Sequence, residues 1–292
     1  MKRFIPQILI FILFTFISAH AQQDVLLQHE KKVQEQEKKL EKLKHGWNLS
    51  LASALTLTQT GYSNWESGGT NFFLITGSVY GSAVYDTTAW NWANDAKIVY
   101  GSSKQNGDRF KKTDDSIDLE TVFIHKNSEL INPYISANFT TQLSAGYKYT
   151  EEGQTEISNF FDPAYLTNGV GIGYSPQKIF RTRLGLATRI IFTQEHNNFA
   201  DGENTKFESG LQWVTRLEKQ LNKNILLKSK LQMFSSFETI QKSNINWDTL
   251  IQASLTKFIV VNMQGLLILD PKVSEKAQIK EVLSVGVQYV FI

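Results

Sequence analysis

The stretch that decides the fold is GWNLSLASALTLTQ, residues 46–59. Large apolar side chains alternate there with small or polar ones, and the apolar face holds Trp47, Leu49, Leu51, Leu55 and Leu57. Alternation with a period of two is typical of a β-strand whose two faces meet different surroundings. Strands of soluble proteins usually have about 5–6 residues, whereas a strand that crosses a membrane at a tilt needs about 9–11. The length of the stretch therefore predicts a membrane-spanning strand.

The same alternation recurs along the rest of the chain. Strands are expected at 46–59, 71–85, 88–103, 115–127, 133–149, 165–175, 179–195, 206–220, 223–238, 244–257, 258–270 and 279–292. Tight turns and longer polar loops alternate between them, as in outer-membrane barrels, whose tight turns face the periplasm. We predict an all-β fold: a single antiparallel transmembrane β-barrel of about twelve strands over residues 46–292, with both ends in the periplasm. A soluble β-sandwich or lipocalin-like barrel is the alternative, but its strands would be shorter.

The first 45 residues differ from this pattern. Residues 1–21 have the form of a cleaved signal peptide: a positive start, an apolar run over 4–17, and small residues that end at Ala21. The apolar run is shorter than the roughly 20 residues that a transmembrane helix needs. Residues 22–45 are rich in Lys and Glu and contain no Gly or Pro, which predicts a short charged periplasmic helix or tether. The expected location is the outer membrane of a Gram-negative bacterium.

Composition excludes some classes of partner. The chain has 30 Lys and Arg against 28 Asp and Glu, and removal of Lys2 and Arg3 with the signal leaves the mature chain neutral. A nucleic-acid partner needs a basic field, so none is expected. Cysteine is absent from the sequence, which suits a closed barrel because backbone hydrogen bonds hold its strands all the way round.

Sequence motifs for catalysis, cofactors or metals are not found. Nothing matches a P-loop, a dinucleotide-binding glycine set, a nucleophile elbow or a zinc-binding helix. No catalytic residue, cofactor or metal is therefore predicted. The one constellation to weigh is Glu195, His196 and Ser209, which could meet at a rim of the barrel in a lipid-modifying enzyme. A solvated histidine at the rim is the simpler interpretation.

The charged residues of the expected strands fall mostly on their polar faces, which point inward in a membrane barrel. The residues expected to line the lumen are Asp95, Lys97, Asp118, Glu120, Lys148, Arg181, Arg183, Arg189, Glu208, Arg216, Glu218, Lys228, Lys230 and Asp248, together with Glu238 and Lys280. Both signs are present in similar number, whereas a pore selective for one sign of ion carries one sign at its constriction. The set predicts a lumen filled by ion pairs, with a narrow water-filled pathway as the alternative.

Several short motifs resemble one family. They are Asn64–Gly69, Lys112–Asp115, Thr141-Gln142 with Gly146-Tyr147, Ile157–Phe161 with Pro163–Leu166, Gly173–Pro176 and Asn246–Asp248. Taken in this order they resemble a Bacteroidetes outer-membrane β-barrel family that carries a domain-of-unknown-function label, over about residues 46–292. The resemblance implies fold and location. It implies no activity, cofactor or catalytic residue.

Two of the expected long loops are unusually apolar or glycine-rich. One contains Trp65, Gly68 and Gly69, and the other contains Phe160, Phe161, Pro163 and Tyr165. Exposed aromatic rings need a surface to pack on. We therefore expect both loops to fold inward as a plug over the lumen.

These features favour a narrow or plugged channel or transporter for a small polar or amphipathic solute. The alternatives are a structural or partner-docking envelope barrel and, less directly, a lipid-modifying enzyme. The expected partners are outer-membrane lipid and lipopolysaccharide, the barrel-assembly machinery, which would read the terminal aromatics Tyr289 and Phe291, and a possible periplasmic protein docked through residues 24–45.

Overall fold

The computed structural model describes residues 46–60, 70–150, 153–177, 179–196, 203–240, 242–271 and 274–291. The expected signal peptide, the charged segment 22–45, and the loop residues Trp65, Gly68 and Gly69 lie outside these ranges. Within them, no helix is long and apolar enough to cross a membrane.

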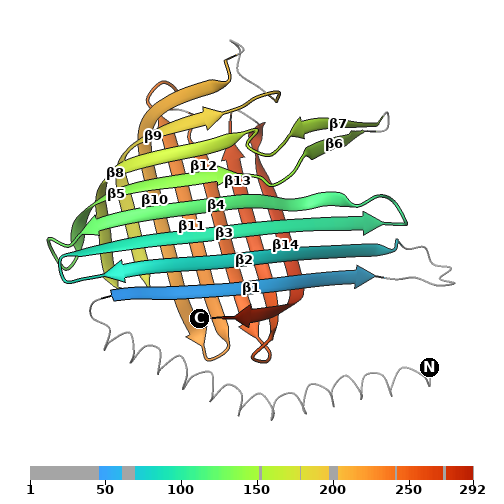
Figure 1. The fold of residues 1–292 in the computed structure, drawn as a ribbon, viewed down its shortest axis with the longest axis horizontal. Coiled ribbons are helices and arrows are strands. Elements are labelled where there is room, and N and C mark those ends of the chain that lie inside the picture. Colours follow the sequence, from blue (N-terminus) through green and yellow to red (C-terminus); the bar gives the residue numbers. More distant parts are fainter. Residues whose placement is uncertain are drawn as a thin grey trace.

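Twelve strands form a closed antiparallel barrel, and two more form a separate hairpin. The barrel strands are β1 (Gly46–Thr60), β2 (Phe72–Asp86), β3 (Trp90–Gln105), β4 (Lys111–His125), β5 (Ile131–Thr141), β8 (Ala164–Gln177), β9 (Phe180–Phe192), β10 (Thr205–Asn222), β11 (Ile225–Ser236), β12 (Asn244–Ser254), β13 (Ile259–Asp270) and β14 (Ser274–Val290). Figure 1 shows β1 to β5 crossing the strands of the far wall at a steep angle, as the tilt of barrel strands requires. The predicted fold and strand number are confirmed.

The sequence prediction is wrong at one strand. Residues 133–149 were expected to form one continuous strand, but β5 ends at Thr141 and the chain leaves the barrel. The carboxylate of Asp115 accepts hydrogen bonds from the backbone N–H groups of Leu143 (2.6 Å) and Ser144 (2.9 Å). Those donors are therefore occupied by a side chain, which turns the chain away from the β4 ladder.

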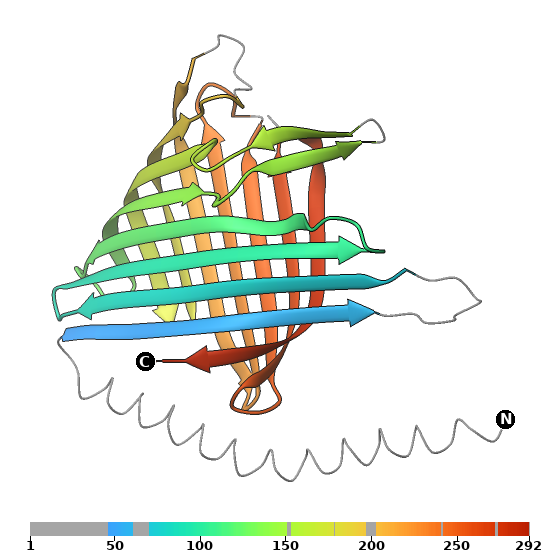
Figure 2. The same ribbon diagram turned by 45° about the vertical axis from the view of Figure 1, so that its right-hand side comes forward.

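Beyond this turn lies the separate hairpin, which we call the arm. It consists of β6 (Gly146–Thr150) and β7 (Gly153–Ser158), which pair with each other. The alternation of Tyr147 and Tyr149 with polar neighbours belongs to this arm and not to the barrel wall. Figures 1 and 2 both show the arm projecting from the rim.

The two faces of the barrel wall have opposite character. Neighbouring residues on β10 show the contrast, since Phe207 is 64% exposed and Glu208 is 2% exposed. Leu283 on β14 is 73% exposed, among many other aliphatic side chains on the outer face. A soluble protein would bury such side chains, whereas a barrel in a bilayer presents them to lipid. The apolar exterior and charged interior are those of a membrane-spanning barrel.

Several polar groups on this outer face are hydrogen-bonded to one another. The indole Nε1 of Trp213 donates to Thr182 Oγ1 (2.8 Å), which is also hydrogen-bonded to Thr215 Oγ1 (2.8 Å). The same arrangement of an indole donor and two polar side chains on neighbouring strands occurs at Trp92 with Thr121 and Asn94, and at Trp247 with Ser229 and Thr249. Because lipid offers no partner, these groups satisfy one another within the wall.

The barrel closes where β1 meets β14. Their ladder runs from Ala52 opposite Val290 to Leu57 opposite Val285, whereas β1 pairs with β2 along its whole length. Figure 2 shows β14 beside β1 only near the end of β14. The seam is therefore shorter than the ladder on the other side of β1.

Candidate functional site

The carboxylate of Glu120 on β4 is an almost fully buried charge in the lumen, since its side chain is 2% exposed. Three cations from other strands meet it. Arg183 on β9 donates to Oε1 and Arg216 on β10 donates to Oε2. Lys230 on β11 places its Nζ 3.1 Å from Oε2. A buried charge is tolerated only when it is paired and hydrogen-bonded. Glu120 has three such partners.

Ion pairs extend from Glu120 in both directions around the lumen. Arg216 also donates to Asp95 Oδ2 at 3.1 Å, and Lys230 lies 4.0 Å from Asp118. Lys97 lies 3.4 Å from Asp248. The resulting set, which we call the central belt, consists of Asp95, Lys97, Asp118, Glu120, Arg183, Arg216, Lys230 and Asp248. It holds four basic and four acidic side chains, so its formal charge is zero.

Neutral side chains complete the central belt. The hydroxyl of Ser82 donates to Asp95 (2.8 Å), the amide of Asn138 donates to Asp118 (2.6 Å), and that of Gln264 donates to Asp248 (2.8 Å). These side chains come from β2, β5 and β13. Sequence analysis missed them because only formal charges were singled out, although the same inward parity would have identified them.

The central belt crosses the lumen and does not merely follow its wall. In the order of strands around the barrel, β4 stands far from β10 and β11, and β3 stands far from β12. The pairs Glu120–Lys230 and Lys97–Asp248 therefore join distant parts of the wall. Charges attract more strongly where protein displaces water, so these side chains brace the interior and occupy its middle.

The other expected lumen residues are placed elsewhere. Arg189 and Glu208 are opposite each other on β9 and β10, and the Arg189 guanidinium lies 4.1 Å from the centre of the Phe234 ring. Glu218 and Lys228 form a 3.0 Å pair, each about half exposed. Arg181 is exposed near one end of β9.

Two further expected residues also lie away from the central belt. Lys280 on β14 reaches the carboxylate of Asp114 on β4, and Glu238 is exposed just beyond β11.

One expected lumen residue is wrong. Lys148 lies on β6, in the arm, which is not part of the barrel sheet. The turn held by Asp115 is the reason, because it removes this segment from the wall. Lys148 therefore does not line the lumen.

The expected aromatic plug is wrong for the part of it that the structure describes. Phe160 is 58% exposed. Phe161 packs against Phe139 and Phe192, with 5.7 Å between ring centres in both cases, and these two rings belong to the outer faces of β5 and β9. The rings thus bury one another at the rim and do not enter the lumen. Tyr165, by contrast, is on the inward face of β8, and Pro163 precedes that strand.

Asp162 fastens two loops at this rim. Its carboxylate accepts hydrogen bonds from the backbone N–H groups of Gln194 (2.9 Å), Glu195 (2.8 Å) and His196 (3.1 Å). His196 Nδ1 lies 2.9 Å from the same carboxylate. Burial of Asp162 raises its pKa, but these hydrogen bonds lower the pKa by more than burial raises it. The pKa of Asp162 is therefore below its usual value.

These contacts answer the question of a catalytic constellation at the rim. The ring of His196 lies against Asp162 and, at 3.7 Å, against Glu156. Ser209 lies on the outer face of β10. In the part of the chain that the structure describes, the expected set of Glu195, His196 and Ser209 is therefore not brought together, and His196 contributes to a structural tie.

Comparison with known proteins finds a family model that matches part of the chain. A family model described as "Protein of unknown function (DUF3078)" matches residues 57–147. This agrees with the resemblance to a barrel family of unknown function over the stretch from β1 to β6, while the origin in Bacteroidetes stays a prediction. No curated protein matches the chain.

Solved structures of similar form include several membrane barrels. The translocator domain of the autotransporter NalP from Neisseria meningitidis has a TM-score of 0.40 and 13% identity, covering 92% of this chain and 98% of its own. An outer membrane channel from Pseudomonas putida F1 has a TM-score of 0.40 and 13% identity, covering 83% and 94%. The NanC porin has a TM-score of 0.37 and 8% identity, covering 82% and 97%.

Proposed function

We propose that the chain is a channel of a Gram-negative outer membrane, closed at rest by the central belt and opened by a small polar solute. The apolar outer face supports a place in a bilayer, since a Lys or Arg side chain there would cost roughly 2–4 kcal/mol at mid-depth. Tight turns near β2–β3 and β12–β13 support a periplasmic orientation for that end.

The observation that carries the proposal is the convergence of Arg183, Arg216 and Lys230 on Glu120. The three cations lie on the neighbouring strands β9, β10 and β11, which stand three to five places from β4 around the barrel, so their contacts with Glu120 cross the lumen and obstruct it. Side chains can exchange partners without moving the wall. A closed state of this kind is therefore compatible with a rigid barrel and a gated pathway.

The balance of charge in the central belt points to the class of solute. A pore that selects cations or anions presents one sign at its constriction, whereas the central belt presents four charges of each sign. A neutral or zwitterionic polar solute can replace the exchanged hydrogen bonds on both sides as it passes. An ion of either sign meets attraction and repulsion together.

Planar-bilayer conductance tests this function. The wild-type barrel should conduct rarely and without selectivity between cations and anions. Glu120→Gln leaves three cations facing one another, so we expect a more open and anion-selective pore. Arg216→Gln leaves an excess of acid and should open a cation-selective pore.

Glu218→Gln is the matched control because its pair with Lys228 is exposed and lies outside the central belt. It should keep the closed state. Faster migration of the unheated sample than of the heated sample on a gel would verify that each variant is folded. If both central-belt variants stayed closed, or shared one selectivity, the central belt would not be the gate.

The other functions weighed from the sequence gain less support. A lipid-modifying enzyme would need a nucleophile beside His196, but the ring of His196 contacts the carboxylates of Asp162 and Glu156, and Ser209 lies on the outer face of β10. Docking to a periplasmic partner through residues 24–45 concerns a segment outside the described residues and stays a prediction.

A further inference from the structure

The ladder that closes the barrel covers only part of the two strands that it joins. β1 pairs with β14 as far as Leu57 opposite Val285, although both strands continue beyond these residues. Continued in register, residues 58–60 of β1 would stand opposite residues 284–282 of β14, but the ladder does not include them. Figure 2 shows β14 turning away from β1 here. We call these two facing strand edges, residues 58–60 and 282–284, the side gap.

The side gap lies near mid-depth of the wall and not at its rim. Glu281, the next residue of β14, is in the row of Gly265 on β13 and Thr249 on β12. Thr249 is the middle residue of β12. Within a bilayer, an open strand edge is tolerated only where it is buried in protein or lines a water-filled space. Lipid alone would therefore leave the edges of the side gap without hydrogen-bond partners.

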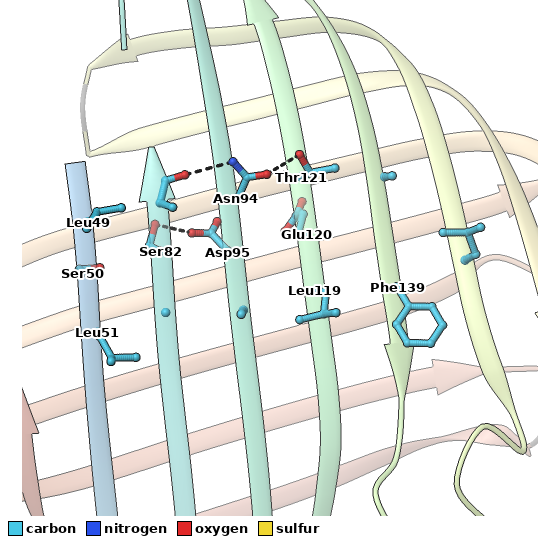
Figure 3. A pocket seen from close by; sticks show the side chains of 15 residues that line it. Leu49, Ser50, Leu51, Ser82, Asn94, Asp95, Leu119, Glu120, Thr121 and Phe139 are labelled. Atoms are coloured by element: carbon cyan, nitrogen blue, oxygen red, sulfur yellow. Dashed lines mark hydrogen bonds between the residues drawn. The ribbon is translucent and has the colours of Figure 1, made fainter. Parts of the chain in front are cut away.

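Apolar side chains line the lumen around the side gap. Ser82 donates to Asp95 in the central belt (Figure 3), which places Ser82 on the lumen side of β2, and side chains two residues apart share a side. Gln264 marks the lumen side of β13 in the same way. The lumen of a membrane barrel is usually polar, so the apolar side chains on this side are unusual. We call them the inner apolar patch: Phe72 and Leu74 on β2, Leu266 and Ile268 on β13, and Val282, which is opposite Gln264, on β14.

The inner apolar patch borders the side gap on both sides. Phe72 is opposite Thr60, at the β1 edge, and Val282 belongs to the β14 edge. On β2 and β13 the patch lies beyond Ser82 and Gln264, toward the ends that carry the long loops. A molecule that enters from the long-loop end would therefore reach the patch and the side gap without passing the central belt.

Two successive charges occupy the inner and outer sides of β14 beside the side gap. Lys280 points to the lumen, where its ammonium donates to the carboxylate of Asp114 on β4. Glu281 is exposed on the outer face, and its partner on β13, Gly265, has no side chain. A charge at mid-depth of a bilayer is costly without a partner. Because Asp114 already neutralises Lys280, the charge of Glu281 favours a basic group in the side gap.

From this arrangement we infer that the side gap is a lateral exit, through which a small apolar molecule with a basic group passes from the lumen into the bilayer. The apolar body contacts the inner apolar patch, and the basic group meets Glu281 as the molecule leaves. The inference goes beyond the proposed function, because this route avoids the central belt. The two share only the place of the barrel in an outer membrane.

A strand of another chain is a weaker candidate for the side gap. Open strand edges can pair with strands of other chains, and such a strand would satisfy the backbone groups of both edges. It would not account for the inner apolar patch, which faces the lumen on β2 and β13 and not the membrane. An apolar molecule with a basic group accounts for the open edges, the patch and the charge together.

Cysteine pairs test whether the side gap is open, since the natural chain has no cysteine. Leu57→Cys with Val285→Cys lies within the ladder. Gln59→Cys with Leu283→Cys lies two residues further on the same face, at positions that a continued ladder would bring together. A disulfide needs Cα atoms within about 7 Å of each other. Mild oxidation should link the first pair, whereas the second should be linked only by a bismaleimide with a long spacer. Equal oxidation of both pairs would show that the edges are paired and would overturn the inference.

Uptake by Gram-negative cells that carry the barrel tests the route. The probes are naphthylmethylamine and naphthylmethanol, which share an apolar body and differ in the basic group, and extraction of filtered cells measures them. We expect the barrel to raise uptake of the amine at least fivefold, and that of the alcohol by less. The bismaleimide link between positions 59 and 283 should remove this gain. The disulfide between positions 57 and 285 is the matched control and should leave it intact.

Single substitutions separate the parts of the exit. Glu281→Gln should lower uptake of the amine to the level of the alcohol. Leu74→Asn, in the inner apolar patch, should lower uptake of both probes severalfold. Val84→Asn is the matched control and should change neither, because Val84 shares the lumen side of β2 with Leu74 but lies on the tight-turn side of Ser82.

Unchanged uptake after the bismaleimide link would contradict the inference, as would equal effects of Leu74→Asn and Val84→Asn. A wild-type dimer in native mass spectrometry that the link prevents would also contradict it, since the open edges would then pair with a second copy. Planar-bilayer conductance tests the proposed function separately, because the path through the central belt does not use the side gap.

Discussion

The central belt and the outer face differ in how their polar side chains find partners. Inside, full charges from distant strands meet, as Glu120 meets Arg183 and Lys230. Outside, neutral groups on neighbouring strands meet, as Trp213 meets Thr182. The lumen allows side chains to reach across, so a charge can find several partners. Lipid offers no partner, and the outer face therefore uses neutral groups within hydrogen-bonding reach of the adjacent strand.

Among substitutions in these two regions, we expect the largest loss of stability at Glu120. Glu120→Ala leaves three cations without their shared anion, and breaking a buried ion pair costs about 3–5 kcal/mol. Urea unfolding of the barrel reconstituted in lipid vesicles measures this loss of free energy. A loss below about 1 kcal/mol, the range of exposed ion pairs, would mean that the central belt is solvated and does not brace the lumen.

A smaller effect is expected on the outer face at Thr182. Thr182→Val removes the acceptor of the Trp213 indole, and a buried donor without a partner costs about 1–3 kcal/mol. The same unfolding measurement applies. In a Trp213→Phe background the indole donor is absent, so Thr182→Val should lower the free energy of unfolding by less. Equal costs in the two backgrounds would show that the indole hydrogen bond contributes nothing.

Acid should loosen the rim at Asp162. The pKa of Asp162 is lowered in the folded protein, so its contribution is complete above the unfolded value of about 3.9 and is lost as pH falls through the folded value. Protease cleavage at residues 193–196 should rise a few-fold in that acid range. Asp162→Asn should be cleaved readily at neutral pH and show no such rise. A wild type that is insensitive to acid would contradict this role.

The smallest effect is expected at the exposed pair of Glu218 and Lys228. Glu218→Gln should change the free energy of unfolding by less than about 1 kcal/mol, because water screens an exposed pair. Addition of salt should leave the difference near zero. A loss comparable to that of Glu120→Ala would remove the distinction between the middle and the end of the lumen.

The strands could be predicted because period-two alternation is a local property of the sequence. The alternation of residues such as Leu49 and Leu51 can be recognised without knowing which strands lie beside them. The inward direction of the charged side chains could be predicted from the same alternation. The arm could not be separated from β5, because alternation continues through Tyr147 and Tyr149 and the cause of the turn is a side chain on another strand, Asp115.

The pairing of charges could not be predicted either. Whether Lys230 meets Glu120 or Glu218 depends on the order of strands and on their stagger around the barrel, which no short stretch of sequence records. The hollow on the outer face of β1 to β5 has the same origin. Ala83, Thr121 and Ala137 are unremarkable in their own strands, and only the register places them side by side.

The short seam between β1 and β14 has a consequence for the order of assembly. All other barrel ladders except that of β5 with β8 join strands that follow one another in the chain. The ladder from Ala52 to Leu57 must instead wait until both ends of the sheet exist. Until then the sheet has two unpaired edges, which are sites for pairing with other chains. A cell that makes this barrel must shield those edges from the moment β1 forms until β14 is in place.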